Sequence, residues 1–352
     1  MLNRRKLLLS VAAAGSAALL PPPRAQAQPS PTAEWLDWMA ANRAKVGAMV
    51  DDGAGRVLAH RANEPMVLAS TVKIVHLTAY AQAVAEGRLD PAEQIRVGDW
   101  DIRHPYVSDG GAHRAALTAL GIPCDEFGIA HDPERLVTLD QIAAAMILFS
   151  DNAAPDYLRH RLGQRALVKA ANWSRPDFRS MQGEVLQLIM PELCGPNPAA
   201  RRAIGDALAA KFIHSAEFRR HTMNRIPAMP STSAQQWPWT SGHMRGTAAD
   251  LAGLHRAVAA TGGLARDHLE RPLASLVPEG ATAVGFKGGS FPRTLTMGMS
   301  VRWKDGRIGS LALLLTGISD EQQAGFEGFL TAGLDALSTS SGFDGLARAL
   351  GA

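Results

Sequence analysis

Hydrophobic and polar positions follow helical spacing in some stretches of the chain and strand-like runs in others. Residues 34–45 show helical spacing, and the strand-like runs 46–50 and 56–61 flank a Gly-containing turn. We therefore predict a helix followed by a β-hairpin. Three successive strands and a closing helix are predicted near the end of the chain, at 282–290, 294–303, 307–315 and 321–337.

The middle of the chain is predicted to be mostly helical. Residues 68–86 are apolar on nearly all sides, as in a buried helix. Further helices are predicted at 138–149, 154–163 and 247–261, whereas 99–123 is rich in Gly, His and Pro and is expected to be irregular. Short helices and Pro-rich turns are expected in 174–242. Together these elements predict an α+β fold in which terminal helices flank an antiparallel sheet, with an all-helical lobe at about 88–245.

The first 27 residues have the features of a signal peptide. A basic start is followed by an apolar stretch at 7–20 and by the small-residue pattern Ala25-Gln26-Ala27. The pair Arg4-Arg5 resembles a twin-arginine signal, the alternative being an ordinary secretory signal. We expect export to the periplasm or the medium, and one functional domain over 28–352. No later segment has about 18 unbroken apolar residues, so no membrane span is predicted.

Composition narrows the possible partners. The chain has 352 residues, a net charge of +3 and no run of basic residues in its body, which does not favour nucleic-acid binding. Export would permit a disulfide between Cys124 and Cys194, but the sequence alone does not establish one. Neither cysteine has a second ligand at metal-binding spacing, so no metal and no cofactor are predicted. We expect a monomer that acts on a small molecule.

The first candidate for chemistry is Ser70-Thr71-Val72-Lys73. Positions i and i+3 share one helix face, so the Ser70 hydroxyl and the Lys73 amine can lie together. A serine needs a base to become a nucleophile, and a desolvated lysine has a lowered pKa and can serve as that base. The alternative, an N-cap serine and a snorkelling lysine, is disfavoured because the helix is apolar around Lys73.

Two later motifs are weaker when taken singly. Ser150-Asp151-Asn152 could relay a proton and hold a substrate amide, or could simply cap a helix. Lys287-Gly288-Gly289-Ser290 ends a predicted strand, where glycines permit close backbone approach and the lysine could bind a carboxylate. The alternative is a surface lysine in a Gly-rich turn. Arg293 follows and is either a second carboxylate ligand or a solvated turn residue.

The order of the three motifs resembles the serine β-lactamases and penicillin-binding proteins, and most of all the class A β-lactamases. The resemblance extends over about 34–337 and includes residues 66–69 and 247–251. It implies that Ser70 is acylated, that Lys73 is the base or proton shuttle and that Ser150 protonates the leaving nitrogen. It further implies a substrate-binding set and an oxyanion hole built from the backbone N–H groups of Ser70 and Ser290. The substrate-binding set comprises Asn152, Lys287, Gly289, Ser290 and Arg293.

One part of the family's pattern is missing. Class A enzymes use a glutamate, within Glu-x-x-Leu-Asn, to activate the deacylating water, and this pattern is absent from the sequence. Glu184 and Glu192 are the candidates, and each is more simply interpreted as a solvated surface carboxylate. Gly288 also stands where a hydroxyl residue is usual. The leading hypothesis is a β-lactamase. The alternatives are a D-Ala-D-Ala carboxypeptidase or esterase with slow deacylation of β-lactams, and a non-catalytic penicillin-binding sensor.

Overall fold

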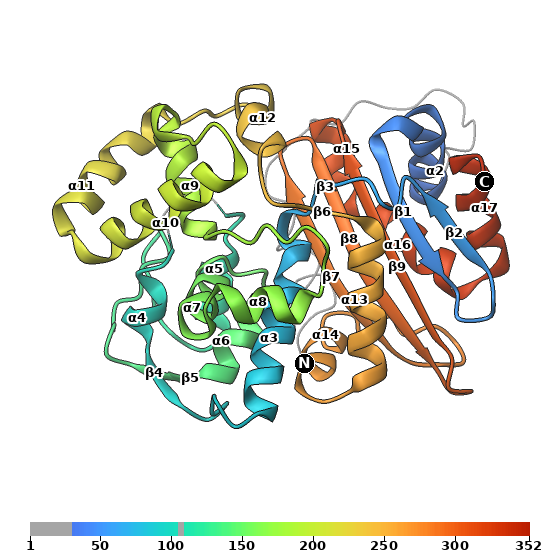
Figure 1. Ribbon diagram of the computed structural model, residues 1–352, viewed down its shortest axis with the longest axis horizontal. Coiled ribbons are helices and arrows are strands. Elements are labelled where there is room, and N and C mark those ends of the chain that lie inside the picture. The colour runs from blue at the N-terminus through green and yellow to red at the C-terminus, as the bar shows by residue number, and fades with distance from the viewer. Residues whose placement is uncertain (1–29, 105–108) are drawn as a thin grey trace, which may run out of the picture.

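A computed structural model describes residues 30–104 and 109–352, and the predicted signal peptide at 1–27 lies outside this part (Figure 1). The expected α+β class is confirmed, because an antiparallel sheet with helices against it lies beside a group of helices. The sheet has the strand order β2-β1-β9-β8-β7, which leaves β7 at one edge. Its strands are β1 (Val46–Asp51), β2 (Val57–His60), β7 (Ala281–Phe291), β8 (Thr294–Trp303) and β9 (Ile308–Thr316).

The sheet is buried on both faces, which explains why its central strands are apolar without interruption. In β9, Leu311, Leu313 and Leu315 belong to one hydrophobic core, while Ala312 and Leu314 belong to another. Successive side chains of a strand point to opposite faces, so these two cores lie on opposite sides of the sheet. The helices on the first side are α2 (Pro31–Ala41), α16 (Phe326–Ser338) and α17 (Ser340–Leu350), and those on the second are α13 (Ala248–Thr261) and α14 (Leu264–Glu270).

The helical lobe is built around α3 (Lys73–Ala85), whose residues 73–80 are all buried. A second, smaller core holds α9, α10 and α11 together. No helix of the described ranges is long and apolar enough to cross a membrane. The other helices of the lobe are α4 (Val97–Asp101), α5 (Ala112–Ala119), α6 (Leu139–Leu148), α7 (Ala153–Leu162), α8 (Gln164–Ala171), α9 (Met181–Ile189), α10 (Pro198–His214), α11 (Ala216–Arg225) and α12 (Ser233–Ser241).

Short elements connect the larger ones. Two small antiparallel pairs form, β3 with β6 and β4 with β5. They are β3 (Met66–Val67), β6 (Arg245–Gly246), β4 (Gln94–Arg96) and β5 (Leu136–Thr138). The 3₁₀ turns are η2 (Arg43–Lys45), η3 (Ala69–Val72), η4 (Pro191–Leu193) and η5 (Ile226–Ala228), and α15 (Asp320–Ala324) precedes α16.

Three sequence expectations need correction. The segment 99–123 is not irregular throughout, because α5 forms there with the Asp109 carboxylate accepting from the backbone N–H groups of Ala112 and His113. The predicted helix at 68–86 begins as the 3₁₀ turn η3 and becomes α-helical at Lys73. The predicted closing helix is divided at Gly325 into α15 and α16, and a further helix, α17, follows it.

The two cysteines are not bonded to each other. Cys124 and Cys194 are both free thiols and both partly buried. Within residues 30–104 and 109–352, no group of three or more His, Cys, Asp or Glu side chains is arranged as a metal site.

Candidate active site

The backbone before Ser70 is held by β8 of the sheet and by the residue that precedes β6. The Leu68 N–H donates to the Met244 carbonyl oxygen at 3.1 Å, and the Leu68 carbonyl accepts from Thr296 Oγ1 at 2.8 Å. Ala69 adopts a left-handed conformation with φ of 47°, which an alanine tolerates only when its surroundings impose it. The tight turn places Ser70, which is partly exposed, in η3 directly before the buried helix α3.

The edge strand β7 lies directly against this turn at Gly289. A Cβ added to Gly289 would come within 2.6 Å of the Ser70 backbone nitrogen and 2.9 Å of the Thr71 nitrogen. A side chain at this position would therefore collide with the backbone of η3. The glycine allows the backbone of β7 to approach the Ser70 N–H, as the predicted oxyanion hole requires.

Lys73 is fully buried and points at the Ser150-Asp151-Asn152 loop. Its Nζ donates to the Ser150 carbonyl oxygen at 2.5 Å, to Ser150 Oγ at 3.2 Å and to Asn152 Oδ1 at 2.6 Å. Burial lowers the pKa of Lys73 to about 8, although the nearby Asp151 charge favours the ammonium form. A lysine with such a pKa is partly neutral near physiological pH and can accept a proton.

Ser150 lies between two lysines. Its Oγ accepts from Lys287 Nζ at 3.0 Å as well as from Lys73 Nζ. The Ser150 backbone has a left-handed φ of 60°, so the loop between α6 and α7 is tightly constrained. Burial, together with the charge of Lys73, holds the pKa of Lys287 well below its usual value. The Ser150 hydroxyl is thus surrounded by proton donors on both sides.

The structure brings together Lys73, Ser150, Asn152 and Lys287, with Ser70 one helical turn before Lys73. In the described part of the chain, the Ser70 hydroxyl makes no hydrogen bond to the Lys73 amine. All three Nζ donors of an ammonium are already used by Ser150 and Asn152. Lys73 must therefore lose a proton and turn towards Ser70 before it can act as a base.

Two further residues near the end of β7 were not found from the sequence. Gln323 of α15 donates to Ser290 Oγ at 2.6 Å. The ring of Trp237 in α12 lies under the Arg293 guanidinium, with 5.2 Å between the guanidinium carbon and the ring centroid. Arg293 therefore has an aromatic neighbour, and its binding of a substrate carboxylate stays a prediction. No local motif marks Gln323 or Trp237, because the contacts join segments far apart in the sequence.

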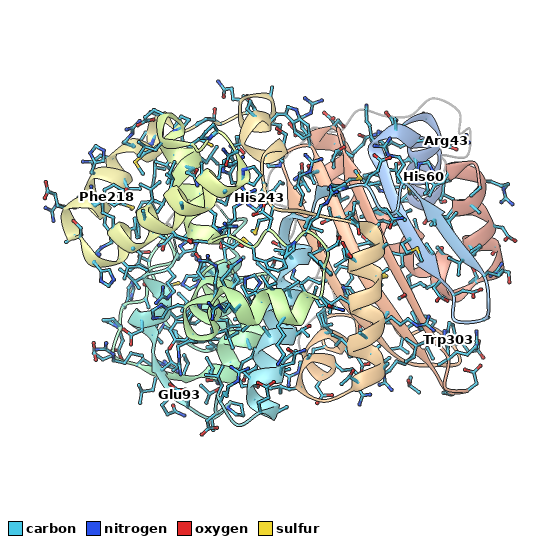
Figure 2. The ribbon with its side chains drawn as sticks, viewed as in Figure 1. Arg43, His60, Glu93, Phe218, His243 and Trp303 are labelled. Atoms are coloured by element: carbon cyan, nitrogen blue, oxygen red, sulfur yellow. The ribbon has the colours of Figure 1, made fainter. Side chains whose placement is uncertain are left out.

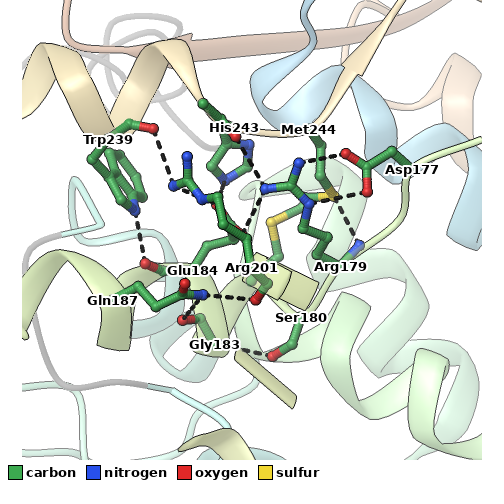
Figure 3. A network of polar contacts seen from close by, with 12 residues as sticks. Asp177, Arg179, Ser180, Gly183, Glu184, Gln187, Arg201, Trp239, His243 and Met244 are labelled. Atoms are coloured by element: carbon green, nitrogen blue, oxygen red, sulfur yellow. Dashed lines mark hydrogen bonds and ion pairs between the residues drawn. The ribbon is translucent and has the colours of Figure 1, made fainter. Parts of the chain in front are cut away.

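Glu184 is buried in a network of polar contacts, so its interpretation as a solvated surface residue is wrong (Figure 3). Its Oε1 accepts from Arg179 Nη1 at 3.0 Å, and its Oε2 accepts from Arg201 Nη2 at 3.2 Å. Burial raises the pKa of Glu184 despite these two arginines. Both carboxylate oxygens are occupied by guanidinium groups, which supports a structural role that ties α9 to α10.

The other candidate base lies at the surface. The Glu192 side chain is 49% exposed and forms an ion pair with Arg225. His243, close to Glu184, lies between the lobe and the sheet, whereas Phe218 of α11 lies at the outer end of the lobe (Figure 2). Among the described residues, neither Glu184 nor Glu192 forms a hydrogen bond with Ser70, Lys73 or Ser150.

Comparison with known protein families gives a match to the N-terminal part of the chain. Residues 31–173 match the model of the β-lactamase enzyme family. This match includes Ser70, Lys73 and the Ser150-Asp151-Asn152 loop, and it confirms the resemblance to the serine β-lactamases and penicillin-binding proteins. A search of curated proteins finds no match.

Several solved structures are similar to this chain at low sequence identity. A β-lactamase from Sphaerobacter thermophilus is 17% identical, with 92% of this chain and 97% of that chain covered and a TM-score of 0.46. A class A β-lactamase from Mycobacterium abscessus is 18% identical, with 90% and 100% covered and a TM-score of 0.49. A β-lactamase from Chitinophaga pinensis is 14% identical, with 86% and 98% covered and a TM-score of 0.49.

Proposed function

We propose that this protein is an active-site-serine acyl hydrolase that opens β-lactam amides through an acyl-enzyme on Ser70. The observation that supports this most directly is the hydrogen-bonded group Lys73–Ser150–Lys287 beside the Ser70 turn. It supplies a lysine with a pKa of about 8, a hydroxyl that can carry a proton, and a second buried lysine whose amine donates to that hydroxyl. These are the groups that acyl transfer from an amide to a serine needs.

In this proposal, neutral Lys73 takes the proton of Ser70 as Ser70 Oγ attacks the lactam carbonyl carbon. The oxyanion that forms is stabilised by the backbone N–H groups of Ser70 and Ser290, a role supported by the close approach of β7 to the Ser70 nitrogen at Gly289. The carbon–nitrogen bond then breaks, and Ser150 gives its proton to the leaving nitrogen and regains one from Lys73. Lys287 donates a hydrogen bond to a substrate carboxylate, while Asn152, released by Lys73, holds an amide of the substrate.

A second candidate function is penicillin binding with slow release. Lys73 Nζ donates to Ser150 and Asn152 but forms no ion pair with any carboxylate in the described ranges. Glu184 and Glu192 are both bound by arginines elsewhere. Hydrolysis of the Ser70 ester needs a base that activates water, so this arrangement favours an acyl-enzyme that persists. If the protein is a D-Ala-D-Ala carboxypeptidase or an esterase, the same site is used and Ser70 is acylated by a peptide or an ester in place of a β-lactam.

We also propose that the protein is exported, by the twin-arginine route, and acts in the periplasm or outside the cell. The support is the order of basic, apolar and small residues in 1–27. A fusion of these residues to a reporter that is active only after export tests this. Loss of export in the double variant Arg4→Lys/Arg5→Lys is expected for the twin-arginine route, and unchanged export would point to the general secretory route.

The test of the reaction uses purified protein and a chromogenic cephalosporin. Sustained turnover that disappears in Ser70→Ala supports a β-lactamase. A burst of about one equivalent followed by very slow turnover supports the second candidate. Neither burst nor turnover, with no reaction of a D-Ala-D-Ala peptide or a simple ester, would contradict both.

A further inference from the structure

His113 lies in the interior of the lobe between two carboxylates. Its Nδ1 is 2.8 Å from Asp151 Oδ1 and its Nε2 is 2.9 Å from Asp101 Oδ1. The side chains of His113 and Asp151 are fully buried, and that of Asp101 is nearly so. A neutral imidazole has a single N–H, so it cannot donate to two carboxylates at once.

Both carboxylate oxygens of Asp151 already accept hydrogen bonds, so a proton on Asp151 is disfavoured. Besides His113, it accepts from the Trp100 indole N–H at 2.8 Å and from the backbone N–H groups of Ala153 and Ala154 at 3.1 and 2.7 Å. Four donors thus converge on its two oxygens, and Asp151 remains a carboxylate. Although burial opposes a charge on His113, the charge of Asp151 and the hydrogen bonds to Asp101 and Asp151 raise the pKa of His113 to about 10.

Asp151 joins this buried group to the candidate active site. It is the residue between Ser150 and Asn152, both of which contact Lys73 Nζ. The left-handed backbone of Ser150 can persist only if the residues on either side are firmly held. Asp151 is also the first of the carboxylates whose charge favours the ammonium form of Lys73. A substitution of His113 is therefore expected to alter both the position of the Ser150-Asp151-Asn152 loop and the charge around Lys73.

We infer that His113 is a positioning residue, held as an imidazolium between Asp101 and Asp151. It fixes the Ser150-Asp151-Asn152 loop and offsets the charge of Asp151 near Lys73. The inference rests on the proposed acylation of Ser70. It assigns a role to a histidine in the segment 99–123, which carries no recognisable motif.

The other groups around His113 are aromatic or form pairs with each other. The ring of Trp100, on α4, meets the His113 ring edge at 4.9 Å between centroids. His104 stacks on His113 at 4.7 Å, and its Nε2 lies 3.3 Å from Asp109 Oδ2. The charged or titratable groups near His113 in the described ranges include Asp101, Asp151, His104 and Asp109, with Cys124 close enough to Asp101 to feel its charge and Lys73 beyond Asp151.

The test compares His113→Asn with His268→Asn as a matched control. His268 is also fully buried and paired with a carboxylate, Asp140, at 2.7 Å, but it belongs to α14 and, among the described residues, forms no hydrogen bond or ion pair with the Ser150 loop. The measurement is the rate of acylation by a fluorescent penicillin across pH. We expect His113→Asn to acylate at least tenfold more slowly and to show its midpoint at higher pH, because Asp151 is no longer offset. His268→Asn is expected to keep the wild-type rate and midpoint.

A second measurement does not depend on whether His113→Asn folds, because it begins with the wild-type protein. In the ¹⁵N-labelled wild-type protein near pH 8, one histidine should have protons on both ring nitrogens. Asp101→Asn should lose this doubly protonated signal at lower pH than wild type. A neutral His113 in wild type, or equal acylation profiles for His113→Asn and His268→Asn, would overturn the inference. Failure of the wild-type protein to be acylated would instead count against the proposed function, whatever the ring signals show.

Discussion

Replacing Gly289 with alanine is expected to slow acylation of Ser70 by about 10- to 100-fold. The added Cβ would lie 2.6 Å from the Ser70 nitrogen and 2.6 Å from Thr296 Oγ1, whereas ordinary contacts begin at 3.4 Å. Either β7 or the Ser70 turn must then move by 0.8 Å, the difference between 3.4 and 2.6 Å. A misplacement of about 1 Å at reacting groups costs about 10²-fold in rate, and overpacking of this kind costs about 1–3 kcal/mol of folding stability.

The assay is the first-order rate of labelling by excess fluorescent penicillin, measured beside thermal unfolding. Gly253→Ala is the matched control, because Gly253 is exposed in α13 and an added Cβ meets nothing within 4 Å. The control should acylate like wild type and gain up to about 1 kcal/mol of stability from its better helix propensity. The reasoning would be refuted by Gly289→Ala that is labelled within about threefold of the wild-type rate and melts at the same temperature.

Three further predictions concern charge and redox state. The rate of acylation should rise with pH around a midpoint near 8, because only neutral Lys73 can accept the Ser70 proton. Lys73→Met should abolish this rise. A wild-type rate that does not change between about pH 6 and 9 would contradict the prediction. Glu184→Gln should lower the free energy of unfolding in denaturant by about 3 kcal/mol, because buried Arg201 loses its counter-charge and buried Arg179 keeps only Asp177. The exposed Glu192→Gln should change it by less than about 1 kcal/mol. If Glu184→Gln keeps wild-type stability but specifically loses deacylation, Glu184 is the base after all. A reductant should leave the melting temperature unchanged because Cys124 and Cys194 are free thiols, and a fall would indicate a disulfide.

The fold was predictable wherever one periodic pattern persisted along the chain. The predicted strands 294–303 and 307–315 differ from β8 and β9 by at most one residue at each end. The segment 99–123 was not predictable in this way. The first N–H groups of its helix α5 donate to Asp109, and its His113 is buried between Asp101, earlier in the same segment, and Asp151, which lies beyond it. Such partners are 12 and 38 residues away, beyond any local pattern.

In the candidate site too, residues in short motifs could be predicted from the sequence, and residues brought in by distant segments could not. The residues in short motifs, Lys73, Ser150 and Lys287, could be identified from residue type and order, and the structure places their side chains in contact. Gln323 and Trp237 reach the end of β7 from α15 and α12, and nothing in their own surroundings in the sequence marks them. Glu184 resembles a surface residue in sequence because its burial depends on Arg179 and Arg201 folding over it.

The central claim is that Ser70 forms a covalent bond with a β-lactam. The most direct measurement is intact mass after brief incubation with penicillin, followed by peptide mapping. We predict a mass increase of one penicillin per chain, on the peptide that contains Ser70, and its absence in Ser70→Ala. An adduct that persists in Ser70→Ala, or a wild-type protein that gains no mass with any β-lactam while it remains folded, would contradict the claim.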